Sequence, residues 1–242
     1  MTSAKRNTSF LDMLNPCLQG KKRRCGRPTP EDTEQLDQYL LEVAAGLFVQ
    51  HGYAGTSVDQ IARKASASKQ TLYRRYASKE DLFKAVITNL TASVLHSIKD
   101  TPLKNPLAEL KHVMQLLLDL SLQPMALGTY RILISDGYRY PTLAEYAKQN
   151  IGGPIDASIL RLLKAAEAAG QINPGNADDT TVDLLSGLIT GAALESALFG
   201  LAPFSTQAER KVFFDRGWTL FVRAVGGECP TPPKTKATPA TA

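Results

Sequence analysis

Two polar side chains one helical turn apart, Gln70 and Arg74, are of the types that read the edges of DNA bases. A guanidinium can donate two parallel hydrogen bonds to guanine, and a carboxamide can pair in the same bidentate way with adenine. If residues from about Ser68 to Tyr76 form a helix, both groups lie about 160° and 200° around its axis from Leu72. The spacing therefore predicts a helix anchored on one face and offering hydrogen-bonding groups on the other.

The residues just before this helix predict the element that positions it. A second short helix is expected from about Ser57 to Ala65, and the small side chain of Ala62 allows the two helices to cross closely. Ile61 and Leu72 supply apolar surface between them. The segment 56–79 is therefore predicted to be a helix-turn-helix, whose second helix enters the major groove of DNA. The alternative is an ordinary helical hairpin with a solvated basic face.

Nine residues of this segment are the candidate DNA contacts. Arg74 and Gln70 are assigned to base edges, and Lys69 and Tyr73 to the phosphates beside them. The helix starts are also assigned to phosphates, because free backbone N–H groups and the helix dipole attract anions there. The full set is Thr56, Ser57, Ser68, Lys69, Gln70, Thr71, Tyr73, Arg74 and Lys79.

The distribution of charge favours a polyanionic partner. The chain has 242 residues and a net charge of +5. Residues 1–30 carry a net +6 and residues 56–79 a net +5, whereas residues 31–55 carry a net −5. The other 163 residues have 15 basic and 16 acidic side chains. Because the basic charge is confined to two blocks near the N-terminus, the pattern indicates that this end meets nucleic acid.

The whole chain is predicted to be all-α. Helix starts are expected where Pro or a capping residue precedes an apolar stripe, at Asn105-Pro106, Pro124, Pro141, Pro154 and Thr206. The predicted organisation is a disordered basic arm (1–28), a three-helix helix-turn-helix domain (29–77), a helical domain (78–226) and a disordered tail (227–242). The arm contains KKRRCGRP, which either reaches an adjacent minor groove or adds non-specific affinity only.

Other classes of function lack the residues they need. The three histidines, His51, His96 and His112, are far apart, and no metal-ligand, nucleophile or phosphate-loop motif is present. We therefore expect no enzyme activity, metal or cofactor. The most apolar window, Leu184 to Leu201, contains Glu195, and the cysteines form no disulfide framework. A cytoplasmic protein without a membrane span is expected.

The stretch GYAGTSVDQIARKASASKQTLYRRYASKEDLF resembles the N-terminal domain of the tetracycline-repressor (TetR/AcrR) family of transcriptional regulators. The segment RILISDGYRYPTLAEY, further along, is similar to one in many members. The likeness is carried by Phe48, Gly52, Tyr53, Thr56, Ile61, Ala62, Thr71-Leu72-Tyr73, Tyr76 and Ser78-Lys79-Glu80.

The resemblance implies a homodimeric regulator, most often a repressor, that binds a palindromic operator in double-stranded DNA. It also implies a small-molecule effector in the C-terminal domain, residues 78–226, which would then serve ligand binding and dimerisation. The closing helices, about Ala177–Phe199 and Thr206–Val225, are the expected dimer face. Candidate cavity walls are Met114, Tyr130, Tyr138 and Trp218. Two alternatives stay open: a non-specific architectural DNA-binding protein, and a helical small-molecule binding module.

The predicted turn departs from the family pattern. Family members commonly have Ala-Gly-Val-Ser where this chain has Ala65-Ser66-Ala67-Ser68. Glycine adopts a positive φ readily, whereas serine loses roughly 1 kcal/mol there. We expect the same turn, with Ser66 at positive φ and slightly lower stability.

Overall fold

The structure is a computed structural model that describes residues 30–99, 105–201 and 204–226. All regular elements in these ranges are helical, which confirms the all-α prediction. The chain divides into two compact units, Met1–Val86 and Ile87–Ala242. The predicted arm, 1–28, and tail, 227–242, lie outside the described residues.

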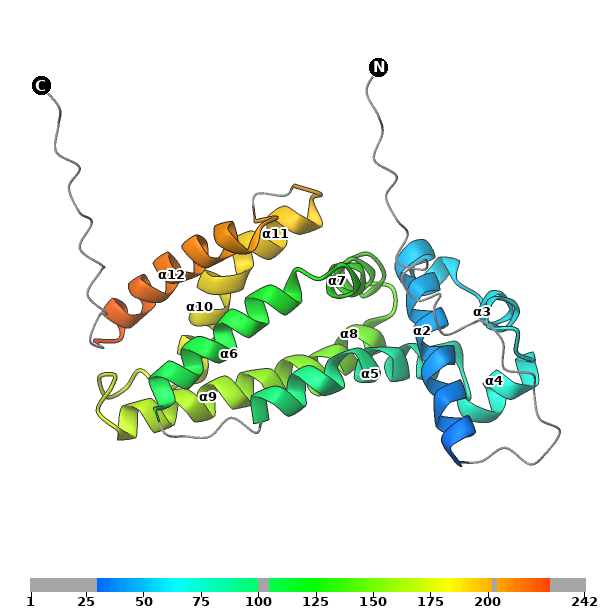
Figure 1. The fold of residues 1–242 in the computed structure, drawn as a ribbon, viewed down its shortest axis with the longest axis horizontal. Helices are drawn as coiled ribbons and strands as arrows, with labels where there is room; N and C mark the ends of the chain where they lie inside the picture. The colour runs from blue at the N-terminus through cyan, green and yellow to red at the C-terminus, as the bar shows by residue number, and fades with distance from the viewer. Residues whose placement is uncertain (1–29, 100–104, 202–203, 227–242) are drawn as a thin grey trace, which may run out of the picture. The chain divides into compact units, whose positions relative to one another are not determined.

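The first unit contains α2 (Pro30–Gly55), α3 (Val58–Lys64), α4 (Lys69–Arg75) and the beginning of α5 (Lys79–Lys99) (Figure 1). Regular helix geometry in α2 breaks at Gly52, which has a φ of 73°. The rings of Phe48 and Phe83 meet edge to face at 5.1 Å, and Tyr53 packs against both. Because Phe83 belongs to this core, the boundary between the units falls inside α5 instead of before it.

The second unit holds the remaining helices, joined in two places by π-helical turns. The turn η2 (Lys148–Gly152) continues α8 into α9, and η3 (Gly187–Gly191) continues α10 into α11. At η2, Pro154 has no N–H for the preceding helical turn, which favours a local change of hydrogen-bond pattern. The helices are α6 (Pro106–Ser121), α7 (Pro124–Asp136), α8 (Pro141–Ala147), α9 (Gly153–Ala168), α10 (Asp179–Ser186), α11 (Ala192–Leu198) and α12 (Gln207–Ala224).

Two of the predicted helix starts of this unit, at Asn105 and Thr206, are observed with side-chain caps. The Asn105 side chain accepts a hydrogen bond from the backbone N–H of Ala108 at 3.1 Å. Thr206 and Glu209 form a reciprocal capping box at the start of α12. These side chains satisfy backbone donors that a helix end otherwise leaves unpaired. The sequence does not predict the π-helical turns. No new helix begins at Pro154, because η2 joins α8 to α9, and η3 lies inside the long helix expected over Ala177–Phe199.

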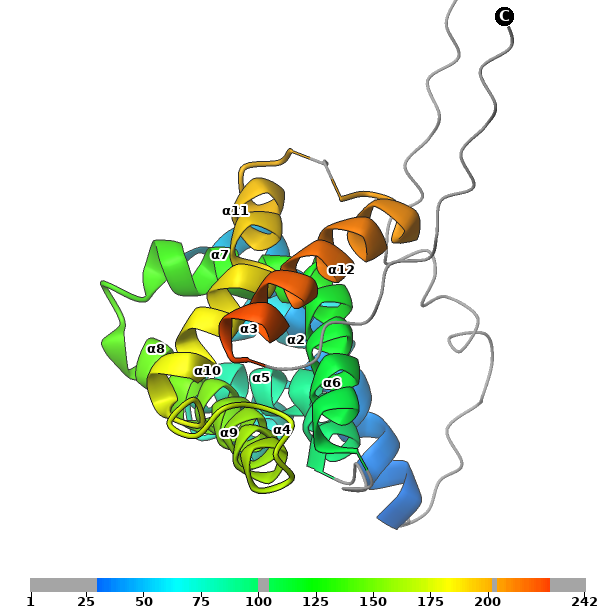
Figure 2. The same cartoon turned by 90° about the vertical axis from the view of Figure 1, so that its left-hand side faces the viewer.

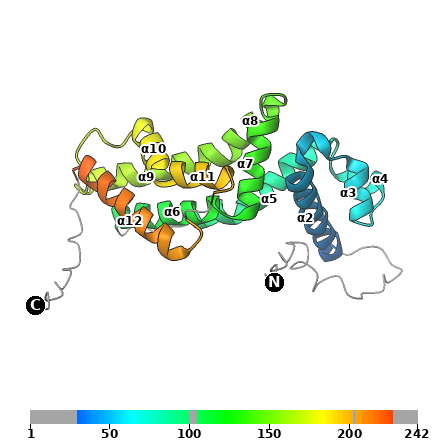
Figure 3. The ribbon, with the colours of Figure 1, turned by 90° about the horizontal axis from the view of Figure 1, so that it is seen from above.

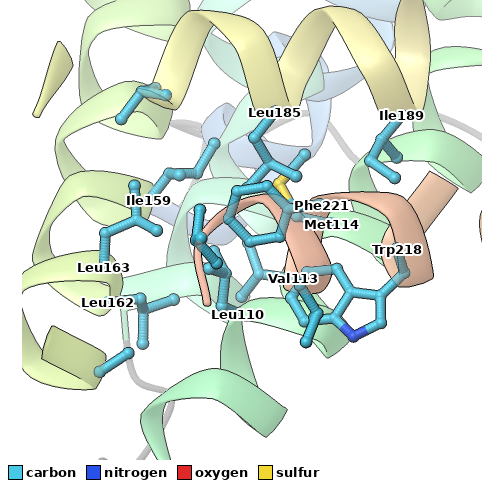
Figure 4. Close-up of a cluster of buried hydrophobic side chains, with 14 of the residues drawn as sticks. Leu110, Val113, Met114, Ile159, Leu162, Leu163, Leu185, Ile189, Trp218 and Phe221 are labelled. Atoms are coloured by element: carbon cyan, nitrogen blue, oxygen red, sulfur yellow. The ribbon is translucent and has the colours of Figure 1, made fainter. Parts of the chain in front are cut away.

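A continuous apolar core holds the second unit together. Helix α6 lies beside α9 (Figure 3), and α12 packs on α6 and η3 (Figure 2). Side chains from these helices interdigitate around Met114 and Leu162 (Figure 4). On α12, the Trp218 ring stacks on Phe214 with centroids 6.2 Å apart. This core fixes α6, α9, α10 and α12 relative to one another.

Several exposed aliphatic side chains lie on the outer side of α10, η3 and α12, between charged residues. Among the described residues, Asp179–Leu198 is the one segment long and apolar enough to cross a membrane by length and composition, and 22% of it is buried. Exposed aliphatic side chains extend from it onto α12. We call this the apolar surface; its members are Leu184, Leu188, Val212 and Leu220.

Candidate nucleic-acid interface

Helix α3 begins with a reciprocal cap. The Ser57 hydroxyl accepts from the N–H of Gln60 at 3.2 Å, and the Gln60 side chain accepts from the N–H of Ser57 at 2.7 Å. Both backbone donors are therefore satisfied within the helix start. Ser57 is exposed at the predicted position, but an approaching phosphate would compete with this cap.

A tight turn joins α3 to α4. The N–H of Ala67 donates to the carbonyl of Ala62 at 2.9 Å, and the N–H of Ser66 donates to Arg63 at 3.2 Å. This pair of bonds is a Schellman motif, which requires a left-handed residue at its centre. Ser66 occupies that position with a φ of 51°, as the sequence predicts.

Helix α4 is anchored by one apolar side chain and capped by Ser68. The Ser68 hydroxyl accepts from the N–H of Thr71 at 3.0 Å. Leu72 is fully buried, whereas Gln70, Tyr73 and Arg74 are exposed. The exposure of these residues agrees with their positions around the helix axis as predicted from the sequence. The side chains that suit base edges face away from the core.

Lys69 lies at the start of α4 and pairs with α3. Its ammonium is 2.9 Å from a carboxylate oxygen of Asp59, and the hydrogen bond to Asp59 raises the pKa of Lys69 above its ordinary value. Its Nζ also lies 5.9 Å from the centre of the Tyr73 ring. Lys69 is therefore charged and exposed, as a phosphate contact needs to be, with Asp59 as a competing anion.

Two predicted contacts are turned toward the protein instead. The Thr56 side chain is 2% exposed, and its hydroxyl donates to the carbonyls of Gly52 and Leu47 at 2.8 and 3.1 Å. Lys79 donates to the carbonyls of Tyr53 and Thr56 at 2.8 and 3.0 Å. The prediction is corrected here: both side chains tie the end of α2 to the next helices, because broken helix geometry at Gly52 leaves carbonyl groups that need donors.

One residue of α4 that the sequence analysis did not single out connects this helix to α2. Arg75 is half-buried and forms an ion pair with Asp37 of α2. Its neighbour Arg74 is exposed. A signal was present in the sequence, because Arg75 falls nearer to the buried face than Arg74 on the same helical wheel.

The second unit contains a cavity of about 690 Å³. Met114 and Tyr130 line it, as predicted, whereas the other two candidates do not. Trp218 is 3% exposed inside the core (Figure 4) and Tyr138 is 98% exposed on the surface, and both assignments are corrected. Helical spacing alone does not distinguish a core residue from a cavity wall, because that depends on how several helices pack.

The cavity walls are mainly apolar, with polar groups at a few places. Partial burial raises the pKa of the Tyr130 phenol. Two charged residues missed by the sequence reasoning, Lys148 and Asp156, also line the cavity. The other lining residues include Ile87, Leu90, Leu117, Leu120, Met125, Leu133, Ile151, Ile155, Ser186 and Thr190. The volume lies in the range of small-molecule sites.

A helix-turn-helix unit followed by a separate helical unit with a cavity defines a DNA-binding transcriptional regulator. Residues 40–86 match the model of the TetR family of bacterial regulatory proteins. Residues 108–226 match the model of the C-terminal domain of AefR-like transcriptional repressors. The chain belongs to the TetR family, whose members are regulators and not enzymes.

Curated relatives and solved structures agree with this assignment. The regulator SrpR of Pseudomonas putida is 28% identical over 198 residues, covering 80% of this chain and 89% of SrpR. The DNA-binding transcriptional repressor TetR of Mycobacteroides abscessus is 28% identical over 167 residues, covering 66% of this chain and 86% of that repressor. The structure of a TetR-family regulator of Mesorhizobium loti is 23% identical, covers 81% of this chain and 98% of that one, and has a TM-score of 0.67. It supports the fold.

Proposed function

We propose that this protein is a homodimeric repressor that binds a palindromic operator through α3 and α4 and is released by a small molecule. The observation that carries the proposal is the division of α4 into a buried Leu72 and an exposed face with Gln70, Tyr73 and Arg74. Such a face can hydrogen-bond to base edges in the major groove. Names of relatives such as the repressor of M. abscessus support repression as the direction of control.

The apolar surface supports a dimer through the closing helices. Leu184 is 69% exposed in the single chain. Gly187 and Gly191 have no atom within 4 Å of the place where a Cβ would stand, so a second backbone could approach closely there. A two-fold dimer presents two recognition helices to two half-sites, which is why palindromic operators suit such proteins.

The cavity supports control by a ligand. Helices α5, α6, α7 and α9 all contribute side chains to its wall. Because α5 begins in the DNA-binding unit and continues into the second unit, it is a covalent path by which an occupied cavity can change the position of α4. A ligand acts only to the extent that it binds the released state more tightly than the DNA-bound state.

The test is binding of the full-length protein to labelled DNA from upstream of its own gene, against a scrambled duplex, over a series of salt concentrations. We expect a preference of about a thousandfold or more at physiological salt and saturation at an even number of chains. The same complex can then be challenged with small molecules. Equal affinity for both duplexes with a steep salt dependence would favour the architectural alternative, in which charge alone drives binding. Ligand binding without any DNA affinity would favour the small-molecule module.

A further inference from the structure

Two residues of opposite charge line the cavity. Among the described residues that line it, Lys148 of η2 is the one with a positive charge and Asp156 of α9 is the one with a negative charge. Asp156 accepts no hydrogen bond from any side chain or backbone group in the described part of the chain, and no ion pair within 4 Å fixes it there. Its carboxylate is therefore available to a ligand in the cavity.

Two carboxylates of the neighbouring α10 also affect Asp156. Asp183 and Asp179 of the neighbouring α10 act on it electrostatically, while Lys148 acts in the opposite sense. Desolvation is the largest cause of the raised pKa of Asp156, followed by repulsion from Asp183. The charges that act on this part of the cavity are therefore mainly negative, and a cation placed there would relieve the repulsion.

The start of α9 does not neutralise this charge. A free helix N-terminus would offer unpaired N–H groups to Asp156. Here η2 runs into α9 without a break, Gly152 and Gly153 both keep helical dihedrals, and the N–H of Gly153 donates to the carbonyl of Lys148. Pro154 has no N–H at all. The backbone near Asp156 thus supplies few donors, so that a donor from a ligand is favoured.

The rest of the cavity suits an apolar body. Leucine, isoleucine, methionine and alanine side chains make up just over half of the lining residues, and the unbranched Met114 and Met125 adapt to ligands of different shape. A charged group can be taken into such a site only when it meets an opposite charge. Asp156, which is exposed to solvent at its place on the wall, provides that charge.

We propose that the effector is a lipophilic cation, with its apolar body against α5, α6 and α7 and its positive group at Asp156. The inference rests on the proposed function, because it specifies the ligand of the same cavity. Asp156 is the residue that selects the positive charge, and Asp183 strengthens the selection from a distance. Carboxylate ligands such as fatty acids are disfavoured by the same charges.

The test uses three fluorescent probes with one aromatic body: 1-pyrenemethylamine, which is a cation at neutral pH, neutral 1-pyrenemethanol, and anionic 1-pyrenecarboxylate. Binding to the full-length protein is measured by fluorescence anisotropy without DNA. We expect the amine to bind about tenfold or more tightly than the alcohol, which corresponds to one charge-assisted contact, and the carboxylate to bind most weakly.

Variants locate the effect. Asp156→Asn should remove the preference for the amine over the alcohol and leave binding of the alcohol unchanged. Glu145→Gln is the matched control, since Glu145 is an exposed carboxylate of α8 that does not line the cavity; it should change neither. Ala126→Trp, which fills the cavity from α7, should weaken all three probes while circular dichroism and unfolding midpoint show that the fold is retained.

Several outcomes would overturn the inference. These are equal affinity for the three probes, tighter binding of the carboxylate that Lys148→Met abolishes, or no binding of any probe. The proposed function fails in a different way, by an absence of operator binding or by operator binding that no cavity ligand changes. Selective amine binding that depends on Asp156 would sustain the inference about the cavity even in that case.

Discussion

At the scale of single residues, adjacent arginines of α4 are expected to have different tasks. Arg74 is exposed opposite Leu72, whereas Arg75 is half-buried and paired with Asp37. Arg74→Ala should weaken operator binding by about 1–3 kcal/mol and relax the preference at one base pair in each half-site. Competition binding against operators with single substitutions measures both effects.

Arg75→Ala is the matched control for this prediction. It removes the same charge one position further along, so any general loss of phosphate attraction is similar in the two variants. Because the Asp37 partner is left behind, we expect Arg75→Ala to lower the midpoint of thermal unfolding and to leave base preference unchanged. A loss of base preference in Arg75→Ala, with none in Arg74→Ala, would reverse the assignment of the two faces.

At the scale of elements, the turn between α3 and α4 offers a gain in stability. Ser66 has a φ of 51° at the centre of the Schellman motif. Ser66→Gly should raise the free energy of unfolding by about 0.5–1 kcal/mol, because glycine takes this conformation without a clash of its Cβ. Chemical denaturation measures it. Ala67→Gly is the control: Ala67 has a negative φ, so there glycine should lower stability.

The contact between α6 and α12 should depend on pH. Asp215 on α12 lies 2.7 Å from Lys211 and 3.4 Å from Lys111 of α6. The hydrogen bond from Lys211 is the main reason that the pKa of Asp215 is lowered from 3.8. A carboxylate whose pKa is lowered by folding stabilises the folded state at pH values above the ordinary pKa. This stabilisation is lost as the pH falls through the lowered pKa of the folded state.

Asp215→Asn should therefore reduce stability near neutral pH, by less than about 1 kcal/mol because the pair is partly exposed. The difference from the unsubstituted protein should shrink as pH falls toward and below 3.8. Urea unfolding at a series of pH values measures it. A difference that grows on acidification would mean that Asp215 is not stabilised as a carboxylate.

The sequence predicts the helices and the turn between α3 and α4 better than it predicts the residues that line the cavity. The helix-turn-helix is local: Ser68, Leu72 and the turn at Ser66 interact with residues a few positions away, and their types alone predict the turn and the buried face. The cavity is formed by helices distant in sequence. Met114 and Trp218 both have the character of wall residues, yet only packing decides that one lines the cavity and the other fills the core. The role of Thr56 depends on a break in α2 that puts carbonyl groups near its hydroxyl.

At the scale of the whole molecule, the apolar surface should hold two chains together. Leu184 is 69% exposed, so a polar side chain there is compatible with the folded protomer. Leu184→Glu would place a charge in the predicted interface without a partner, which strongly disfavours association. We expect monomers in sedimentation velocity experiments, at concentrations where the unsubstituted protein is a dimer.

Loss of the dimer should have a larger effect on DNA binding than loss of any single base contact. Two linked helix-turn-helix units bind two half-sites with an avidity about 10²–10⁴ times that of one unit, so Leu184→Glu should lower operator affinity by a factor in this range. Ile134→Glu is the matched control, since Ile134 on α7 is 66% exposed but lies outside the apolar surface; it should remain dimeric and bind the operator normally. If Ile134→Glu dissociates the protein and Leu184→Glu does not, the dimer is built on α7 instead of on α10 and α12.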